Sequence, residues 1–314
     1  MRSIKIASRA SKLALTQSNY ARALLLELDP DLDIQIVEIS TKGDRDKSDF
    51  LYKTSSVGFF TSEVENALLD GRADLAVHSL KDLPTAITEG LVIAAIPKRE
   101  SVADALITNT GASSIADLPS GASVGTSSLR RIAQVNHIRD DLNCVPLRGN
   151  VETRVNKVAA GQVDAAIVAC AGLNRLKLSD KISAALPPDE FIPAPAQGAL
   201  AFQIRTDNPE LNELVSKLND QPSRITAETE RSILATMHGG CSIPLGVYSY
   251  IDGDTINIEA MISDVEGKNL IKLSKSAPLD QRQQAAKALA EELLNKGGRQ
   301  ILDNIRDERE NPSD

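Results

Sequence analysis

The sequence predicts an α/β protein in which two similar α/β lobes flank a cleft and a smaller C-terminal α+β domain follows. In the first two thirds of the chain, short apolar strands alternate with amphipathic helices, a pattern typical of parallel sheets covered by helices. Within that part, "DGRADLAVHSL" (70–80) and "AGQVDAAIVAC" (160–170) share Gly, Asp and Ala positions at a constant offset of 90 residues. The repeat favours two copies of one α/β unit, and open α/β sheets bind ligands in a cleft at their strand ends.

The first lobe begins with a strand, a helix and a second strand. "SIKIAS" (3–8) and "IQIVEIS" (34–40) are strand-like, and "SKLALTQSNYARALLLEL" (11–28) is an amphipathic helix that Ser11 can cap. This order implies a parallel pair of strands. The polar segment 41–58 then interrupts the alternation, and its length without structure predicts a mobile lid or a disordered segment. The lobe continues with helix 60–71 and strands 73–79 and 91–96.

The alternation then starts again and forms the second lobe. Its expected elements are strands 103–108 and 122–127, a helix from Ser128, strand 144–147, helix 151–161 and strand 163–169. A proline-rich crossing at 187–198 leads to strand 199–205, which we expect to return to the first lobe and make it discontinuous. The remaining elements are helices 208–219 and 222–236, strands near 246–251, 256–264 and 269–275, and a helix over 279–305. The predicted domains are residues 1–98 with 195–218, residues 99–194, and residues 219–314.

Composition excludes several classes of function. The 314 residues carry a net charge of −8, only 3% aromatic residues and no Trp, which argues against a nucleic-acid partner. No signal-peptide core and no stretch long enough to span a bilayer is visible, so we expect a cytoplasmic protein without a membrane partner. Three scattered cysteines do not make a disulfide framework. The three histidines, at 78, 137 and 238, are too widely spaced for a metal site, and no metal is expected.

Basic residues recur where the predicted strands end. They are Arg9, Lys81, Arg130, Arg131, Arg148, Arg154 and Arg175. Strand ends of a doubly wound sheet share one edge, so these side chains can converge. "GTSSLRR" adds hydroxyls and free backbone N–H groups at a helix N-terminus, which favours an anion. Any one arginine alone is more simply a solvated surface charge, but the set predicts a polyanion site that is not a P-loop, because the Gly-Lys-Ser/Thr ending is missing.

Two further residues leave alternatives open. Asp82, in "SLKDLP", is either a turn-capping aspartate or, in a basic cleft, a proton donor and cation stabiliser. Cys241 stands between glycines in "HGGCSIPLG" (238–246), where close backbone approach or a positive φ is expected. It is a nucleophile, an attachment point or an incidental thiol. Cys144 and Cys170 lie in strand-like apolar runs, which predicts burial.

Seven blocks of the sequence resemble one known family. They are "ASRASKLAL", "ADLAVHSLKDLPT", "VGTSSLRR", "LRGNVETR", "AGLNRL", "PAPAQGALA" and "HGGCSIPLG". In order and spacing, from Ile4 to about Gly246, they resemble porphobilinogen deaminase, also called hydroxymethylbilane synthase. The resemblance implies three α/β-type domains, the first two similar to periplasmic-binding-protein lobes. It also implies a transferase that joins four porphobilinogen molecules head to tail with loss of ammonia and releases 1-hydroxymethylbilane for tetrapyrrole (haem) biosynthesis.

The resemblance assigns roles to residues in the matching blocks. A dipyrromethane cofactor would be joined to Cys241 by a thioether, and Asp82 would be the catalytic carboxylate. The residues implied to bind the cofactor are Lys81, Ser127, Arg130, Arg131, Arg148 and Arg154. Those implied to bind the substrate are Arg9, Ser11, Gln17, Phe60, Arg175 and Gln197. The family also implies a monomer whose product passes to uroporphyrinogen-III synthase.

The chain departs from the family pattern at two positions. Val57 stands where many members have an active-site-loop lysine, and His238 stands where an acidic residue is usual, so neither role transfers. Two other classes compete with the resemblance: a non-catalytic solute-binding protein for an organic anion, and a thiol acyltransferase using Cys241 and His238. The first would not need the Cys241 loop, and the second lacks a visible third group to orient the histidine.

Overall fold

The computed structural model describes residues 3–40, 61–237 and 243–310, with side chains described to residue 307. These residues form two compact units. The first contains 3–40, 61–100 and 198–225, and the second contains 101–197, 226–237 and 243–310. The division into three domains, with boundaries near 98, 194 and 218, stays a prediction. The expected lid at 41–58 lies outside the described residues, as do Val57, Phe60, His238 and Cys241.

The first unit is built on a five-stranded sheet in the order β2-β1-β3-β10-β4. The strands are β1 (Ser3–Arg9), β2 (Asp33–Ile39), β3 (Leu75–Ser79), β4 (Leu91–Ala95) and β10 (Leu200–Arg205). β1 is parallel to β2 and β3, as the strand-helix-strand order predicts, and β10 is antiparallel to β3 and β4. The strand after the proline-rich crossing therefore does return to the first sheet, where it separates β3 from β4.

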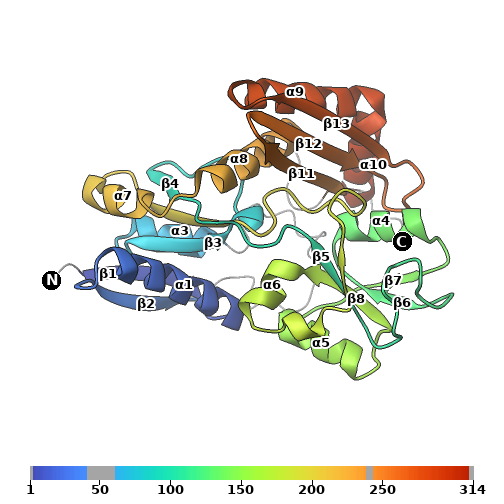
Figure 1. Cartoon of the computed structure of the whole chain (residues 1–314), viewed down its shortest axis with the longest axis horizontal. Coiled ribbons are helices and arrows are strands. Elements are labelled where there is room, and N and C mark those ends of the chain that lie inside the picture. The colour runs from blue at the N-terminus through green and yellow to red at the C-terminus, as the bar shows by residue number, and fades with distance from the viewer. Residues whose placement is uncertain (1–2, 41–60, 238–242, 311–314) are drawn as a thin grey trace. The chain divides into compact units, whose positions relative to one another are not determined.

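Helices cover both faces of this sheet (Figure 1). They are α1 (Lys12–Leu28), α3 (Ser62–Leu69) and α7 (Pro209–Ser216). The Ser11 hydroxyl accepts the backbone N–H of Ala14 at 3.3 Å, so Ser11 caps α1 as predicted. Leu25 of α1 packs with Ile6 of β1 on one face, and Leu68 of α3 packs with Ala7 on the other, because successive strand residues point to opposite faces.

The second unit contains a sheet with the same arrangement, in the order β7-β6-β8-β5-β9. Its strands are β5 (Asp104–Thr108), β6 (Ser123–Gly125), β7 (Asn143–Val145), β8 (Ala165–Ala169) and β9 (Ala184–Leu186). β6 is parallel to β7 and β8, and β5 is antiparallel to β8 and β9. β3 and β8 occupy the same place in their sheets and come from the two halves of the 90-residue repeat. The predicted repeat is thus confirmed as a repeat of sheet topology.

Three helices accompany the second sheet: α4 (Leu129–Ile138), α5 (Val151–Ala159) and α6 (Cys170–Arg175). The prediction of Cys170 in a strand-like run is wrong, because the strand ends at Ala169 and Cys170 opens α6. Its predicted burial is right, since the residue is 2% exposed. Neither α6 nor β9 was expected from the sequence. The helix α6 is shorter than two helical turns and the strand β9 is shorter than a typical strand, so neither shows a recognisable hydrophobic period.

The C-terminal part of the second unit is an antiparallel meander with helices. It comprises β11 (Leu245–Asp252), β12 (Thr255–Ile262), β13 (Ile271–Pro278), α9 (Arg282–Leu293), α10 (Arg299–Glu310) and, from residue 226 on, α8 (Gln221–Thr236), which begins in the first unit. α9 lies against β12 and β13 (Figure 1). The single helix predicted over 279–305 is wrong, because Gly297 adopts φ 121° and breaks it. The fold class, two α/β lobes with a smaller α+β part, is as predicted.

Candidate active site

In the first unit, the predicted site residues gather where β1 and β3 end. Arg9 is the last residue of β1, and Lys81 and Asp82 follow β3 directly. Because β1 and β3 are neighbouring parallel strands, their carboxyl ends lie at the same sheet edge. Gln17, buried in α1, donates from Nε2 to the Ser79 hydroxyl at 3.1 Å. Gln17 therefore ties α1 to the end of the strand that leads to Asp82.

Asp82 lies in a single 3₁₀ turn, Leu80–Asp82. The turn is closed by the backbone, since the N–H of Leu83 donates to the carbonyl of Leu80. The Asp82 side chain is exposed, and among the described residues its carboxylate has no hydrogen-bond partner. The turn-capping alternative for Asp82 thus has no support in this structure. An exposed carboxylate beside a strand end is free to meet a ligand.

In the second unit, the predicted residues again follow the parallel strands. Ser127 comes after β6 and donates its hydroxyl to the carbonyl of Leu147 at 3.2 Å. Arg148 comes after β7, Arg154 lies in the second turn of α5, and Arg175 ends α6 beyond β8. These residues share the carboxyl edge of β6, β7 and β8. The strand order thus places these residues at one edge within this unit, and their roles toward a ligand stay predictions.

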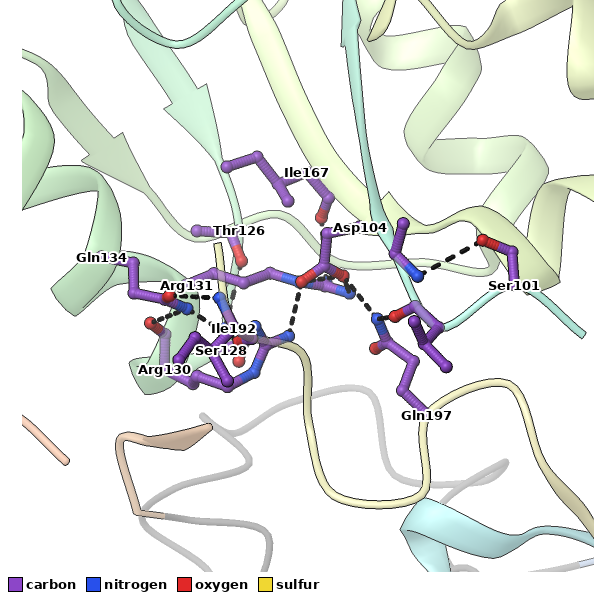
Figure 2. Close-up of polar contacts among 12 residues, drawn as sticks. Ser101, Asp104, Thr126, Ser128, Arg130, Arg131, Gln134, Ile167, Ile192 and Gln197 are labelled. Atoms are coloured by element: carbon purple, nitrogen blue, oxygen red, sulfur yellow. Dashed lines mark hydrogen bonds and ion pairs between the residues drawn. The ribbon is translucent and has the colours of Figure 1, made fainter. Parts of the chain in front are cut away.

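Arg130 and Arg131, at the start of α4, are buried around a carboxylate that the sequence did not single out (Figure 2). Asp104, the first residue of β5, is fully buried. Its Oδ2 accepts from Nη2 of Arg130 at 2.8 Å, and its Oδ1 accepts from Nη2 of Arg131 at 2.6 Å and from Nε at 3.1 Å. Burial alone would raise the pKa of Asp104, but the two guanidinium charges and their hydrogen bonds outweigh it and hold that pKa well below its usual range.

The cations of this unit act on one another. Burial, together with the like charges of Arg131 and Arg148, lowers the pKa of the Arg154 guanidinium to about 10. Arg154 also donates from Nε to the carbonyl of Gly149 at 2.9 Å. With a pKa of about 10, Arg154 stays protonated near neutral pH. Three cations within electrostatic reach of one another, in partly desolvated positions, form a site suited to a ligand with several carboxylates.

Gln197, predicted to bind substrate, is fully buried beside Asp104 (Figure 2). Its Nε2 donates to Asp104 Oδ1 at 3.0 Å and to the carbonyl of Val102 at 2.8 Å. In this structure the described contacts of Gln197 are those of a residue that supports Asp104. Its role toward substrate stays a prediction, as do the roles of Phe60 and Cys241, which lie outside the described residues.

Family models match almost the whole chain. The model described as porphobilinogen deaminase, dipyromethane cofactor binding domain, matches residues 4–213, and the model of the porphobilinogen deaminase C-terminal domain matches residues 224–295. The chain belongs to the porphobilinogen deaminase family. A porphobilinogen deaminase from Maridesulfovibrio salexigens is 45% identical over 98% of this chain and 99% of that protein. Those of Syntrophobacter fumaroxidans and Gloeobacter violaceus are 40% and 41% identical over 97% of this chain, covering 98% and 94% of those proteins.

Among solved structures, the second substrate binding domain of a putative amino acid ABC transporter from Streptococcus pneumoniae is 15% identical, with a TM-score of 0.41. It covers 69% of this chain and 91% of that one, and so weak a likeness carries no argument. Within the described residues, no helix is long and apolar enough to cross a membrane.

Family membership establishes the reaction. Porphobilinogen deaminases are transferases that polymerise porphobilinogen, with loss of ammonia, on a dipyrromethane cofactor for tetrapyrrole synthesis, and this chain is such an enzyme. The two competing classes, a non-catalytic solute-binding protein and a thiol acyltransferase, are therefore set aside. The residues of the second unit fit the cofactor, because the pyrroles of a dipyrromethane carry acetate and propionate groups and Arg131, Arg148 and Arg154 present converging positive charge.

Asp104 is the main residue that the sequence reading missed. It lies at the second position of the predicted strand "ADALIT" (103–108), and the sequence analysis gives it no role of its own. The available signal was the position itself, because a carboxylate is almost never fully buried unless it is paired. An aspartate at the head of a buried strand therefore calls for a cation, although the sequence does not indicate which cation that is.

Proposed function

We propose that the arginines of the second unit hold the carboxylates of the dipyrromethane cofactor and of the chain assembled on it. The supporting observation is the mutual effect of Arg131, Arg148 and Arg154, whose charges are close enough to lower the pKa of Arg154. Charge-assisted hydrogen bonds from arginine forks to carboxylates offset the cost of bringing these cations together. Arg130, Ser127 and Lys81 complete the set of proposed cofactor-binding residues.

The cofactor itself is proposed to be attached to the Cys241 sulfur by a thioether. When bound, it supplies the pyrrole carbon to which the first substrate unit is joined. Porphobilinogen carries one acetate and one propionate, and its proposed binding residues are Arg9, Ser11, Gln17, Phe60, Arg175 and Gln197. Arg9 and Arg175 would pair with substrate carboxylates, since both follow parallel strands as the other cations do.

Asp82 is the proposed catalytic carboxylate. Porphobilinogen loses ammonia when its aminomethyl C–N bond breaks, and the substrate becomes an azafulvene cation. A carboxylate beside the aminomethyl group offsets the positive charge that develops, and it can donate the proton with which ammonia leaves. The exposure of Asp82 and the absence of a described hydrogen-bond partner support this role, because the side chain is not committed to the fold.

We further propose that the protein works in the cytoplasm as a monomer and that its product passes to uroporphyrinogen-III synthase. The monomer and the passage of the product are supported by the family resemblance alone. Sedimentation equilibrium of the purified enzyme tests whether it is a monomer. A single species near the 33.6 kDa mass of the chain is expected, and a stable dimer would contradict the proposal.

Intact-mass measurement tests the cofactor site. The purified parent should be heavier than its polypeptide by a dipyrromethane, and Cys241→Ser should have the bare mass. Arg131→Leu and Arg154→Leu should yield folded protein with little or no added mass, because cofactor carboxylates lose their partners.

Arg139→Leu is the matched control for the arginine variants. Arg139 follows the other end of α4 and is bonded to Asp141 and to the backbone carbonyl of Ala116. It lies outside the set of proposed ligands, so its variant should retain the cofactor mass. Full cofactor content in both Arg131→Leu and Arg154→Leu would remove the arginines from the proposed site.

A further inference from the structure

Asp104 is a buried carboxylate for which the reaction has no direct use. Within the described parts of the chain, it is the carboxylate that Arg130 and Arg131 contact. The three residues come from β5 and from the first turn of α4, and they are 0%, 3% and 6% exposed, respectively. Burial of charged groups to this degree is costly unless the charges are compensated.

The charge of this cluster does not sum to zero. Two guanidinium groups and one carboxylate leave one net positive charge. The first turn of α4 contains no acidic residue, and the N-terminal end of the helix adds partial positive charge. Without Asp104 the cluster would hold two buried positive charges, whose repulsion would separate or reorient the side chains.

Hydrogen bonds fix the direction of each guanidinium group. Arg130 donates from Nη1 to the carbonyl of Ile192 at 2.7 Å, and Arg131 donates from Nη1 to the carbonyl of Ile167 at 2.9 Å. With the bonds to Asp104, Arg130 uses two and Arg131 three of the five N–H donors that a guanidinium offers, counted over the described residues. The remaining donors are held in set directions, as in a preorganised site.

We propose that Asp104 is a positioning residue of the cofactor site: its carboxylate is the internal counterion that orients Arg130 and Arg131 and leaves them one net positive charge, which one carboxylate of the bound cofactor neutralises. Gln197 assists by donating to the same carboxylate. The inference rests on the proposed function, in which these arginines bind the cofactor. Asp104 itself touches neither cofactor nor substrate in this role.

The test compares the effect of Asp104→Asn on the thermal midpoint in two backgrounds. One is the cofactor-bearing enzyme, and the other is the Cys241→Ser protein, which cannot anchor the cofactor. In the Cys241→Ser background the midpoint should fall by roughly 10 °C, since two buried cations lose their counterion. In the cofactor-bearing enzyme the fall should be less than half as large, because bound carboxylates neutralise the arginines in place of Asp104.

Gln134→Met is the matched structural control. Gln134 lies in α4 and is buried, and its amide bonds the backbone N–H and carbonyl of Ile192. Its loss removes hydrogen bonds from the same helix but no charge, so the midpoint should fall equally in both backgrounds. An equal fall for Asp104→Asn as well would show a purely structural role and overturn the proposal. A folded Asp104→Asn protein that purifies without cofactor, while Gln134→Met retains it, would show that cofactor carboxylates do not take the place of Asp104 and would also overturn the proposal.

If Asp104→Asn does not fold, the double variant Asp104→Asn/Arg130→Met decides the question in the Cys241→Ser background. It restores the net charge of the cluster to +1, so folded protein should be recovered. A double variant no more soluble or stable than the single one would overturn the charge argument.

Failure of the proposed function has a different signature. If Arg131→Leu and Arg154→Leu both assemble full holoenzyme, the arginines do not bind the cofactor, whatever Asp104 does. If Arg131→Leu loses the cofactor and Asp104→Asn costs the same in both backgrounds, only the inference about Asp104 is wrong.

Discussion

At the scale of single residues, Asp82 and Asp104 show how one side-chain type takes opposite environments. Asp104 is fully buried and bonded to two guanidinium groups, whereas Asp82 is exposed in a turn that the backbone closes unaided. Loss of Asp104 should therefore disturb the fold around α4. Loss of Asp82 should disturb chemistry.

Replacement of Asp82 by Asn removes the charge and keeps the shape. The rate of ammonia release in a single turnover should fall by about 10²- to 10⁴-fold, because the amide neither transfers a proton nor offsets the positive charge that develops. The thermal midpoint should stay within a few degrees of the parent. A folded Asp82→Asn enzyme that carries cofactor and deaminates porphobilinogen at nearly the parental rate would take Asp82 out of the mechanism.

A second buried polar group, His78 in the first unit, begins a chain of hydrogen-bonded side chains. His78 Nε2 lies 2.9 Å from Gln203 Oε1, and Gln203 Nε2 donates to Glu65 Oε1 at 2.8 Å. Because the Glu65 carboxylate accepts from the Gln203 amide, the Gln203 oxygen faces His78, and Nε2 of His78 carries the proton. Burial lowers the pKa of His78 to about 4, although the hydrogen bond to Gln203 opposes the shift.

This lowered pKa makes the stability of the protein depend on pH. Between pH 6.5 and about 4 the unfolded chain binds a proton at this histidine and the folded protein does not, so stability falls as the pH falls through this range. His78→Gln removes the titration. Over that range the free energy of unfolding of the parent should fall by about 3 kcal/mol more than that of the variant. At lower pH the difference between the two should not grow further. Urea unfolding at a series of pH values measures both, and parallel curves would contradict the assignment.

At the scale of elements, α4 is fixed at both ends. Its first turn is bonded to Asp104, and its last turn is bonded to the loop between β12 and β13, where Asn136 donates to the carbonyl of Val265 and His137 Nδ1 lies 2.9 Å from the carbonyl of Gly267. Gly267 has φ 72°, and a Cβ there would overlap the α4 backbone at Ala133 and His137. Only glycine allows this close approach.

Gly267→Ala should therefore lower the free energy of unfolding by more than backbone strain alone would. Gly253→Ala is the matched control, because Gly253 also has a positive φ, 57°, but a Cβ there would have no atom within 4 Å. We expect the control to lose about 1 kcal/mol from strain and Gly267→Ala to lose about 3 kcal/mol or more from strain and overlap together. Urea unfolding of the two variants gives the comparison. Equal losses would mean that the loop between β12 and β13 moves away from α4 without penalty.

At the scale of the whole molecule, the elements that the sequence predicts are those with a long or repeated pattern. The 90-residue repeat locates β3 and β8 in equivalent places, and the apolar segment 199–205 is assigned to the sheet of the first unit. Short elements such as α6 and β9 show no period and are missed. The break at Gly297 is missed because a glycine near a helix end does not by itself reveal a positive φ.

The candidate site divides in the same way. Cations that follow strands are predictable, because parallel strands end at one edge. The pairing of Arg130 and Arg131 with Asp104 is not, because it joins residues 26 and 27 positions apart that only the tertiary fold brings together. Local sequence carries no signal for a contact of that kind.

The insertion of β10 between β3 and β4 also dictates an order of events during synthesis. The ribosome delivers β3 and β4 by residue 95, but their shared neighbour ends at residue 205. At typical elongation rates the nascent chain waits roughly 5 to 20 seconds for it, with two strand edges open to wrong partners. The second sheet, contiguous from 104 to 186, is complete before the first. Of the two five-stranded sheets, the one begun first is therefore the one completed last, and chaperone dependence is expected to concentrate there.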